Sequence, residues 1–376
     1  MKEDPSASRR GFLRNFGFGL GGGALRAVGM LGKLEQMAEA AQNLDRKVGF
    51  ALVGLGDWAT NRIAPALLKS KYCALAAVVS ADEQKLQQWS KKYNLPSNSL
   101  YTYETFDQLA FNSAVDVVYV LLPNSMHSEF AVRAAQAGKH VLCETPMEVS
   151  VEKCQRMIEA CQCAGKQLGI GYRAPFDPHH RELRRLAREK VFGDVKIIEA
   201  SFGSRLDKPD SWRHKRDLAG GGALFNLGVH ALNSACDIAG EEPIEVMAHE
   251  TKSDLPQFAE LDESVFWTLK FPNGIIANGA STYRVDGMNR IWAGADRGFF
   301  ELSSPFGSEG VKGMSSNGKI EFPTVDPIAA QMDDFAQCIA TGTRPRASGE
   351  EGLRDVKIIT ALYESIQNGG HTVAIH

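Results

Sequence analysis

Short apolar runs and helical patterns alternate along the first half of the chain. Near-continuous apolar runs predict buried strands at 47–53, 74–79, 115–122, 140–143 and 167–171. Apolar residues at helical spacing predict helices at 61–70, 83–93, 106–111, 129–137 and 151–164. Continuous apolar strands that alternate with helices indicate a parallel sheet covered by helices on both faces.

Beyond residue 193 the pattern becomes rich in strands with turn signals between them. Strands are expected at 195–202, 244–249, 264–271, 275–282 and 290–294, and two helices, 328–340 and 352–368, close the chain. We expect a mostly antiparallel sheet with one open face. Because the segments 264–271 and 275–282 carry apolar residues on both faces, we also expect the open face to form a homo-oligomer, either a dimer or a tetramer.

The first forty residues have the pattern of a targeting segment. Ser8-Arg9-Arg10-Gly11-Phe12-Leu13 is a twin-arginine pattern, and Ala38-Glu39-Ala40 is typical of a cleavage site. The weakly apolar stretch 15–25 is too short to span a bilayer, so no stable membrane span is expected. We interpret residues 1–40 as a leader and expect a periplasmic protein that is exported in folded form. An N-terminal arm with a chance arginine pair is the alternative.

Composition narrows the functional classes. Lys and Arg number 42 and Asp and Glu 45, which gives a formal net charge of -3. This balance disfavours a dedicated nucleic-acid binder, which needs a basic face. The seven Cys are scattered and show no spacing typical of zinc ligands, so neither a disulfide scaffold nor a metal site is expected.

A glycine-rich turn after the first strand carries the clearest chemical signal. Gly54-Leu55-Gly56-Asp57-Trp58-Ala59 fits the G-x-G-x-x-G/A fingerprint, in which the glycines let backbone N–H groups approach a pyrophosphate. The turn follows a strand and opens a helix, as the fingerprint requires. We therefore expect an α/β fold with an N-terminal Rossmann dinucleotide-binding domain at 46–172. A C-terminal α/β domain with the large, mostly antiparallel open sheet is expected at 173–376.

The end of the second strand bears on the choice of dinucleotide. NAD-binding proteins usually place Asp or Glu there to bind the ribose 2′-hydroxyl, whereas this chain has Val79-Ser80-Ala81. Ser80 can hydrogen-bond a 2′-phosphate, and Lys85 can pair with it. NADP is therefore favoured, and NAD stays open.

Several stretches together indicate a known family. They are 122–127 (LPNSMH), 138–147 (GKHVLCETPM), 171–173 (GYR), 212–213 (WR), 220–224 (GGGAL) and 240–246 (GEEPIEV). Over residues 46–373 the chain resembles the Gfo/Idh/MocA oxidoreductases, and within them the branch of periplasmic glucose–fructose oxidoreductases. The resemblance implies that the Rossmann domain holds NAD(P) and that the second domain builds the sugar site and the oligomer interface.

The resemblance also implies which residues form the site. Further cofactor-binding positions are Leu122, Pro123, Asn124, His127, Glu144, Thr145, Arg173, Trp212 and Arg213. The implied catalytic positions are His230, Thr145, Asn226 and Tyr172.

Two of these positions depart from the family pattern. Thr145 occupies the place of the Lys in the family's Glu-Lys-Pro motif, and Asn226 stands where Asp is usual, while His230 is retained. Positions 226 and 230 lie one helical turn apart, so both side chains can face one pocket. A neutral His is a plausible base for a sugar hydroxyl, since its ordinary pKa is about 6.5.

The sequence thus predicts an NADP-dependent oxidoreductase that acts on a sugar or sugar derivative. Two alternatives remain: a hydrolase or lyase that oxidises its substrate transiently, and a sugar-binding protein that keeps the cofactor without turnover. His179 and His180 lie close to Arg181, Arg184, Arg185 and Arg188. We interpret this cluster as a solvated basic helix face and not as a binding site.

Overall fold

The structure, a computed structural model, describes residues 46–208, 211–307 and 310–375. The expected leader, residues 1–40, lies outside these residues. In the described ranges no helix is both long and apolar enough to cross a membrane. The seven cysteines all lie within the described residues, and all are free.

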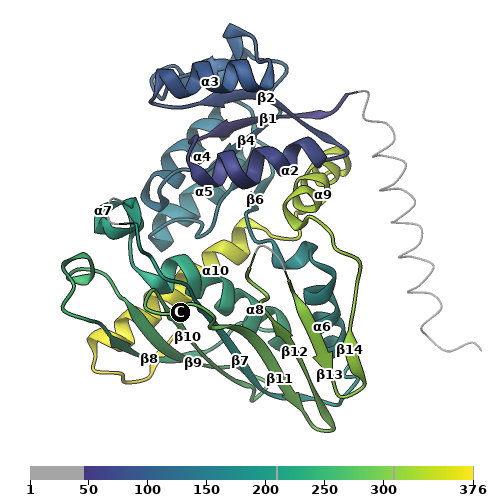
Figure 1. Ribbon diagram of the computed structural model, residues 1–376, viewed down its shortest axis with the longest axis vertical. Coiled ribbons are helices and arrows are strands. Elements are labelled where there is room, and N and C mark those ends of the chain that lie inside the picture. The colour runs from purple at the N-terminus through teal and green to yellow at the C-terminus, as the bar shows by residue number, and fades with distance from the viewer. Residues whose placement is uncertain (1–45, 209–210, 308–309, 376) are drawn as a thin grey trace, which may run out of the picture. The chain divides into compact units, whose positions relative to one another are not determined.

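A six-stranded parallel sheet occupies the first half of the chain (Figure 1). Its order is β3-β2-β1-β4-β5-β6, and every pairing in it is parallel. The strands are β1 (Val48–Val53), β2 (Cys73–Val79), β3 (Leu100–Tyr101), β4 (Val117–Val120), β5 (His140–Cys143) and β6 (Leu168–Ile170). The strand order reverses between β2-β1 and β1-β4, and such a reversal is where ligands bind in open α/β sheets.

Helices connect these strands and cover the sheet. They are α2 (Ala64–Lys69), preceded by a π-turn at Ala59–Ile63, α3 (Glu83–Tyr93), α4 (His127–Gln136) and α5 (Val151–Cys163). Short 3₁₀ turns lie at Ser97–Ser99, Phe106–Phe111 and Asn124–Met126. In α5, Cys154, Met157 and Cys161 are buried, which is the spacing of one helix face, and Ser150 caps its first turn.

The second half builds a nine-stranded sheet of order β14-β13-β12-β11-β7-β10-β9-β8-β15. Its strands are β7 (Val195–Gly203), β8 (Glu245–Thr251), β9 (Ser264–Lys270), β10 (Ile276–Thr282), β11 (Asn289–Ala295), β12 (Gly298–Ser303), β13 (Lys312–Ser315), β14 (Gly318–Ile320) and β15 (Val373–Ala374). Only β10 and β7 pair in parallel; every other pairing described is antiparallel.

Helices cover one face of this sheet. They include α6 (Pro178–Arg188), α8 (Val229–Ala239), which follows a π-turn at Leu224–Gly228, and α10 (Gly349–Gln367). The remaining short elements are α7 (Arg216–Ala219) and 3₁₀ turns at Ala174–Phe176, Trp212–His214 and Pro256–Phe258. On the opposite face, Phe266 keeps 53% of its surface exposed, and Ile197 and Met247 are also exposed.

The helix α9 (Pro327–Thr341) returns from the second half to the first sheet. It packs against α2 and β2 and lies beside α2 in Figure 1. Asp333 on α9 accepts a hydrogen bond from the Ser70 hydroxyl at 2.6 Å and from the backbone N of Tyr72 at 2.9 Å. Part of the expected second domain therefore covers the Rossmann sheet.

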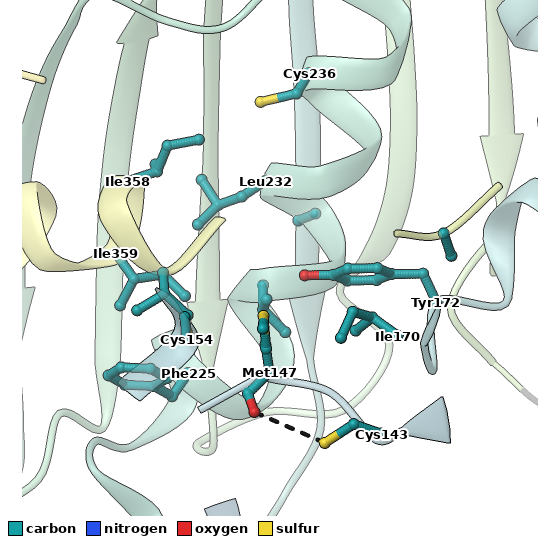
Figure 2. Close-up of a cluster of buried hydrophobic side chains, with 14 of the residues drawn as sticks. Cys143, Met147, Cys154, Ile170, Tyr172, Phe225, Leu232, Cys236, Ile358 and Ile359 are labelled. Carbon is teal, nitrogen blue, oxygen red and sulfur yellow. Dashed lines mark hydrogen bonds between the residues drawn. The ribbon is translucent and has the colours of Figure 1, made fainter. Parts of the chain in front are cut away.

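One hydrophobic cluster is shared by the two sheets (Figure 2). Cys143, Met147 and Ile170 come from the first sheet and its connections, whereas Leu232 on α8 and Ile359 on α10 come from the layer above the second. All five are buried. The shared core fixes the ends of β5 and β6 against the start of α8.

The predicted fold class is confirmed. The bounds of α3, β5 and the short helix Phe106–Phe111 agree with the prediction, and the other predicted elements shift by a few residues. β13 and β14, the last two strands at one end of the sheet, were not predicted, because they are mostly exposed and show no alternation of apolar residues.

Candidate functional site

The phosphate-binding turn has the backbone that its glycines predict. Gly54 has φ +96°, a conformation that favours glycine, and a Cβ there would lie 2.8 Å from the carbonyl oxygen of Leu121. A Cβ on Gly56 would meet nothing within 4 Å. Ala59, which is buried, begins the helix. The turn thus leaves open space in front of the backbone of Gly56, where the fingerprint puts a pyrophosphate.

A hollow beside this turn holds one of the two residues expected to select NADP. A cavity of about 390 Å³ is lined by residues of the turn, Leu55, Gly56 and Asp57, and by residues of α3, including Lys85. Lys85 is exposed and unpaired by any carboxylate within the described residues. Ser80 is buried, and its hydroxyl oxygen accepts a hydrogen bond from the backbone N of Asp82 at 3.1 Å.

Glu144, at the end of β5, organises the part of the cleft nearest to Thr145. Its Oε1 atom accepts hydrogen bonds from the Trp58 indole at 2.8 Å and from the Tyr119 hydroxyl at 2.7 Å. The Arg173 guanidinium lies 5.2 Å from the centre of the Trp58 ring, within the range of a cation–π contact. Burial lowers the pKa of Arg173, while Glu144 raises it. Trp58 therefore joins the phosphate-binding turn to a half-buried cation.

Thr145 and His230 face one another across the two halves of the molecule. The Thr145 hydroxyl lies 3.4 Å from His230 Nε2. His230 stands at the start of α8, inside a cage of aromatic rings: the centres of Tyr172 and Phe202 are each 6.2 Å from its own, and that of Phe306 is 6.3 Å away. The fold thus brings together two residues that are 85 positions apart in the sequence.

The surroundings keep His230 neutral. Burial, followed by the positive charge of Arg173 and by His180, lowers the pKa of His230 to about 3. The expectation of a base with a pKa near 6.5 therefore changes, because the site that brings His230 to Thr145 also removes it from water. At neutral pH its ring offers one N–H donor and one nitrogen acceptor.

Asn226 holds an arginine and does not contact His230 through a hydrogen bond in the described structure. Its Oδ1 accepts from Arg213 Nε at 3.1 Å, and the Arg213 guanidinium lies 4.5 Å from the centre of the Trp212 ring. Lys208, four residues before Trp212 in the sequence, contacts Asp57 of the phosphate-binding turn, with Nζ and Oδ2 2.5 Å apart.

Tyr172 contributes its ring to the site and its hydroxyl to the core. The ring lines the cavity next to His230, while the hydroxyl points into the buried cluster (Figure 2). The hydroxyl has no hydrogen-bond partner in the described structure, and burial and then the Asp355 carboxylate raise its pKa. This placement does not aim the hydroxyl at a bound substrate.

A cavity of about 690 Å³ opens beyond His230. Tyr172, Arg173 and His230 form one end of it. Residues from the start of α6, Asp177, His179 and His180, line its side, and the segments 305–307 and 310–327, with gaps, complete the wall. A concave, mixed polar and apolar space of this size, next to perturbed titratable groups, has the character of a substrate pocket.

Comparison with known proteins identifies the family. The profile of an oxidoreductase family with an NAD-binding Rossmann fold matches residues 48–172, and that of the GFO/IDH/MocA C-terminal domain matches residues 180–301. Together these matches span more than half of the chain. The chain belongs to the Gfo/Idh/MocA oxidoreductase family.

Two kinds of relatives illustrate the membership. The structure of an aldose–aldose oxidoreductase from Caulobacter crescentus is 38% identical, with a TM-score of 0.85 over 88% of this chain and 100% of that one. A D-xylose 1-dehydrogenase [NADP(+)] from Haloarcula marismortui is 29% identical over 85% of this chain and 91% of its own length. A D-xylose 1-dehydrogenase (NADP(+)) from Haloferax volcanii is 26% identical over 85% of this chain and 98% of its own.

Some residues that were expected to bind the cofactor in this Gfo/Idh/MocA protein instead hydrogen-bond the backbone that forms the cleft. His127 is fully buried and places Nε2 2.8 Å from the Leu122 carbonyl oxygen and Nδ1 3.0 Å from that of Pro146. The Asn124 amide donates to the carbonyl oxygen of Ala219 at 2.8 Å. Pro123 lies three residues after the end of β4 and directly before the 3₁₀ turn Asn124–Met126. They fix the backbone that carries Thr145 and the glycine-rich run.

The interpretation of His179 and His180 as part of a solvated helix face is wrong. Both are buried and line the cavity. Only the arginines follow the prediction: Arg185 is exposed on α6 and pairs with Glu182 and Glu189. The signal in the sequence was the eleven-residue helix itself, whose apolar positions Leu183 and Leu186 mark a buried side that includes the two histidines. Among the described residues no group of His, Cys, Asp and Glu has the arrangement of a metal site.

Proposed function

We propose that this protein is an NADP-dependent oxidoreductase that moves a hydride between a sugar hydroxyl carbon and the nicotinamide. The observation that carries the proposal is the meeting of Thr145 and His230, 3.4 Å apart, where the cleft of the first sheet reaches the cavity of the second. The relatives support a sugar substrate, since by their names they act on xylose or other aldoses. The same names support NADP.

The residues present fit a dinucleotide. Gly56 leaves room for a pyrophosphate, the Gly54 backbone avoids the clash that a Cβ would make, and Lys85 borders the hollow beside the turn. A 2′-phosphate next to Lys85 would gain a charge-assisted hydrogen bond. When bound, the nicotinamide supplies the hydride acceptor or donor, and the protein supplies orientation and proton transfer.

We assign the contacts with the substrate oxygen to Thr145, His230 and Arg173. The Thr145 hydroxyl and His230 Nε2 lie 3.4 Å apart, so both can hydrogen-bond one sugar hydroxyl, one as donor and the other as acceptor. Loss of the hydroxyl proton leaves a negative charge on that oxygen. Arg173, whose positive charge helps to lower the pKa of His230, stabilises this charge.

Arg173 is therefore the residue to which we assign the charge that the family's Lys would supply at position 145. With a pKa of about 3, His230 is a weak base, and it holds a proton only transiently at neutral pH. We assign it the hydrogen bond that orients the substrate oxygen and the first step of proton removal. Asn226 acts indirectly, by holding Arg213.

The experiment is a single-turnover assay on purified protein loaded with NADP. A panel of aldoses is added, and the absorbance of reduced nicotinamide is followed. Reduction of the cofactor by at least one aldose supports the proposal. Release of an aglycone from glycosides without net cofactor reduction would favour a redox-assisted hydrolase, and neither signal would favour a sugar-binding protein.

We further propose periplasmic delivery by the twin-arginine route, supported by Arg9 and Arg10 in their sequence context. Replacing both residues by Lys should leave the protein in the cytoplasm. Unchanged delivery of this variant, measured by cell fractionation, would contradict the route.

We also propose a homo-oligomer through the open face of the nine-stranded sheet. Phe266 and Met247 are exposed on the neighbouring strands β9 and β8, and Ile197 is exposed on β7, which β10 separates from β9. Such apolar surface is usually covered. Light scattering at micromolar concentration should give a dimer or a larger species. The variant Phe266→Glu should shift the mass toward the monomer, whereas a monomeric native protein would refute this proposal.

A further inference from the structure

The large cavity extends well beyond the spot where Thr145 and His230 meet. A hexose has about a dozen non-hydrogen atoms, and if each takes at most the ~30 Å³ that one water occupies in the liquid, a hexose fills roughly half of such a space. The cavity measures about 690 Å³, and its lining does not include Thr145 or the phosphate-binding turn. Space for a second ring-sized group therefore remains after one sugar is placed against His230.

Aromatic and apolar side chains surround this second space. Phe306 is buried beside His230 and His180, with its ring centre 6.3 Å and 6.1 Å from theirs. Further out, Phe322 meets His179 edge to face, with ring centres 5.4 Å apart, and is 40% exposed. Val311, Ile320 and three prolines complete the wall. Such a lining favours a group with an apolar face, because aromatic rings stack on such faces.

The polar groups of this space are few and specific. His179 is 9% exposed, and its Nδ1 lies 3.3 Å from Asp177 Oδ1 without a hydrogen bond in the described structure. His179 lines the cavity, so its ring can contact a ligand there. Lys312 and Lys319 are exposed at the rim, and Lys319 Nζ lies 3.8 Å from Glu321 Oε1, so the rim offers little net charge for a phosphate group.

We propose that the site prefers a glycoside to a free monosaccharide. Its sugar ring lies at Thr145 and His230, and a ring-sized aglycone lies between Phe306 and Phe322, with an oxygen within reach of His179. The proposal rests on the proposed function for the position of the sugar ring. An aryl group and a second sugar ring share the required chemistry, an apolar ring face, and the test below separates them.

The test measures equilibrium binding to the NADP-loaded protein by calorimetry. For each of several aldoses, the free sugar, its methyl glycoside, its phenyl glycoside and a disaccharide are compared. We expect the phenyl glycoside or the disaccharide of at least one aldose to bind at least tenfold more tightly than the methyl glycoside. The tighter of the two identifies the class of aglycone.

Two variants test whether Phe322 forms part of the binding site for the aglycone. Phe322→Ala, at a side chain that is 40% exposed, should reduce the tenfold preference to threefold or less. The control Phe111→Ala, at a residue that is 90% exposed on the first half of the chain, should keep it. A preference that survives in Phe322→Ala would overturn the proposed position of the aglycone.

The proposal and the proposed function fail in different ways. Equal or weaker binding of every larger glycoside, or no binding of any member of the panel, would overturn the glycoside proposal. If free aldoses still reduce the bound cofactor in that case, the oxidoreductase function stands. If glycosides bind with the predicted preference but no sugar reduces the cofactor, the hydride transfer fails and the glycoside site stands.

Discussion

The two ends of the candidate site differ in how the chain encodes them. The dinucleotide end is made by consecutive residues, Gly54 to Ala59, whose backbone borders the space proposed for the pyrophosphate. The sugar end is made by side chains from distant segments, among them Thr145, His230 and Phe306. Backbone chemistry at a turn leaves a short sequence pattern, whereas a pocket of side chains exists only after the two sheets have packed together.

The two ends also differ in which substitutions they tolerate. At the dinucleotide end, what matters is the absence of side chains at Gly54 and Gly56. At the sugar end, the charge and protonation of buried groups decide the chemistry, and they depend on Arg173 and His180 around His230. Substitutions at the first end should therefore affect cofactor binding, and those at the second should affect the rate.

The largest effect is expected at the sugar end, from His230→Ala. Removal of a group that takes part in proton transfer typically lowers the rate by about 10²–10⁴. We expect a loss of kcat in this range, with the Kd for NADP changed less than threefold. If His230→Ala weakened NADP binding as well as lowering kcat, the two ends of the site would not act separately. His371→Ala, at an exposed histidine, is the control.

At the dinucleotide end we compare Gly56→Val with Gly54→Ala. Gly56 borders open space, so its substitution should weaken NADP binding at least tenfold with a change in stability of about 0.5 kcal/mol or less. Gly54→Ala should also destabilise the fold, by about 1–3 kcal/mol, because of its positive φ and the contact with Leu121. NADP titration and thermal unfolding test both. An unchanged affinity of Gly56→Val for NADP would show that the pyrophosphate does not bind at this turn.

A smaller change is expected from introducing, at positions 145 and 226, the residues that the sequence resemblance implies for the family. Thr145→Lys adds a positive charge beside the reacting oxygen, and Asn226→Asp adds a carboxylate that also pairs with Arg213. We expect a modest gain in NADP reduction for Thr145→Lys and a larger, non-additive gain for the double variant, since residues that act as a unit are not additive. A double variant that binds NADP but is no faster on any aldose would favour the hydrolase or binding-protein alternative.

The smallest effect concerns stability and pH. Burial lowers the pKa of His230 to about 3 and that of His140 to about 4, whereas in the unfolded chain both bind protons near pH 6.5. Their contribution to stability is therefore present above pH 6.5 and is lost as the pH falls toward 4, by at most about 1.4 kcal/mol per histidine and pH unit. His140→Gln should flatten this decline and His371→Gln should not. Urea unfolding at pH 7 and pH 5 measures the difference.

The sequence predicted the first sheet better than the site of the second. The strands of the first sheet are buried on both faces, so their apolar runs are visible without tertiary information, as at Val48–Val53. The cavity wall was not predictable, because β13 and β14 are short, mostly exposed strands with no periodic pattern. His179 and His180 looked solvated among arginines, and only the packing of α6 reveals that they face inward.

The contacts of His230 were likewise not predictable from the sequence. The sequence placed it near Asn226 on one helix, and the structure brings it to Thr145 instead, while Asn226 binds Arg213. Its low pKa depends on the charge of Arg173 and on the surrounding rings of Tyr172 and Phe202, none of which lies near it in the sequence.

The central claim is that a sugar C–H hydrogen is transferred as a hydride to the nicotinamide beside His230. Its most direct measurement uses the sugar that turns over best, prepared with deuterium at one carbon at a time, on the NADP-loaded protein. After reaction the cofactor is released by denaturation and examined by mass spectrometry. We predict that deuterium from a single sugar carbon appears in the reduced nicotinamide, and that His230→Ala slows its appearance without changing which carbon supplies it. Turnover without deuterium in the nicotinamide from any carbon would contradict the account.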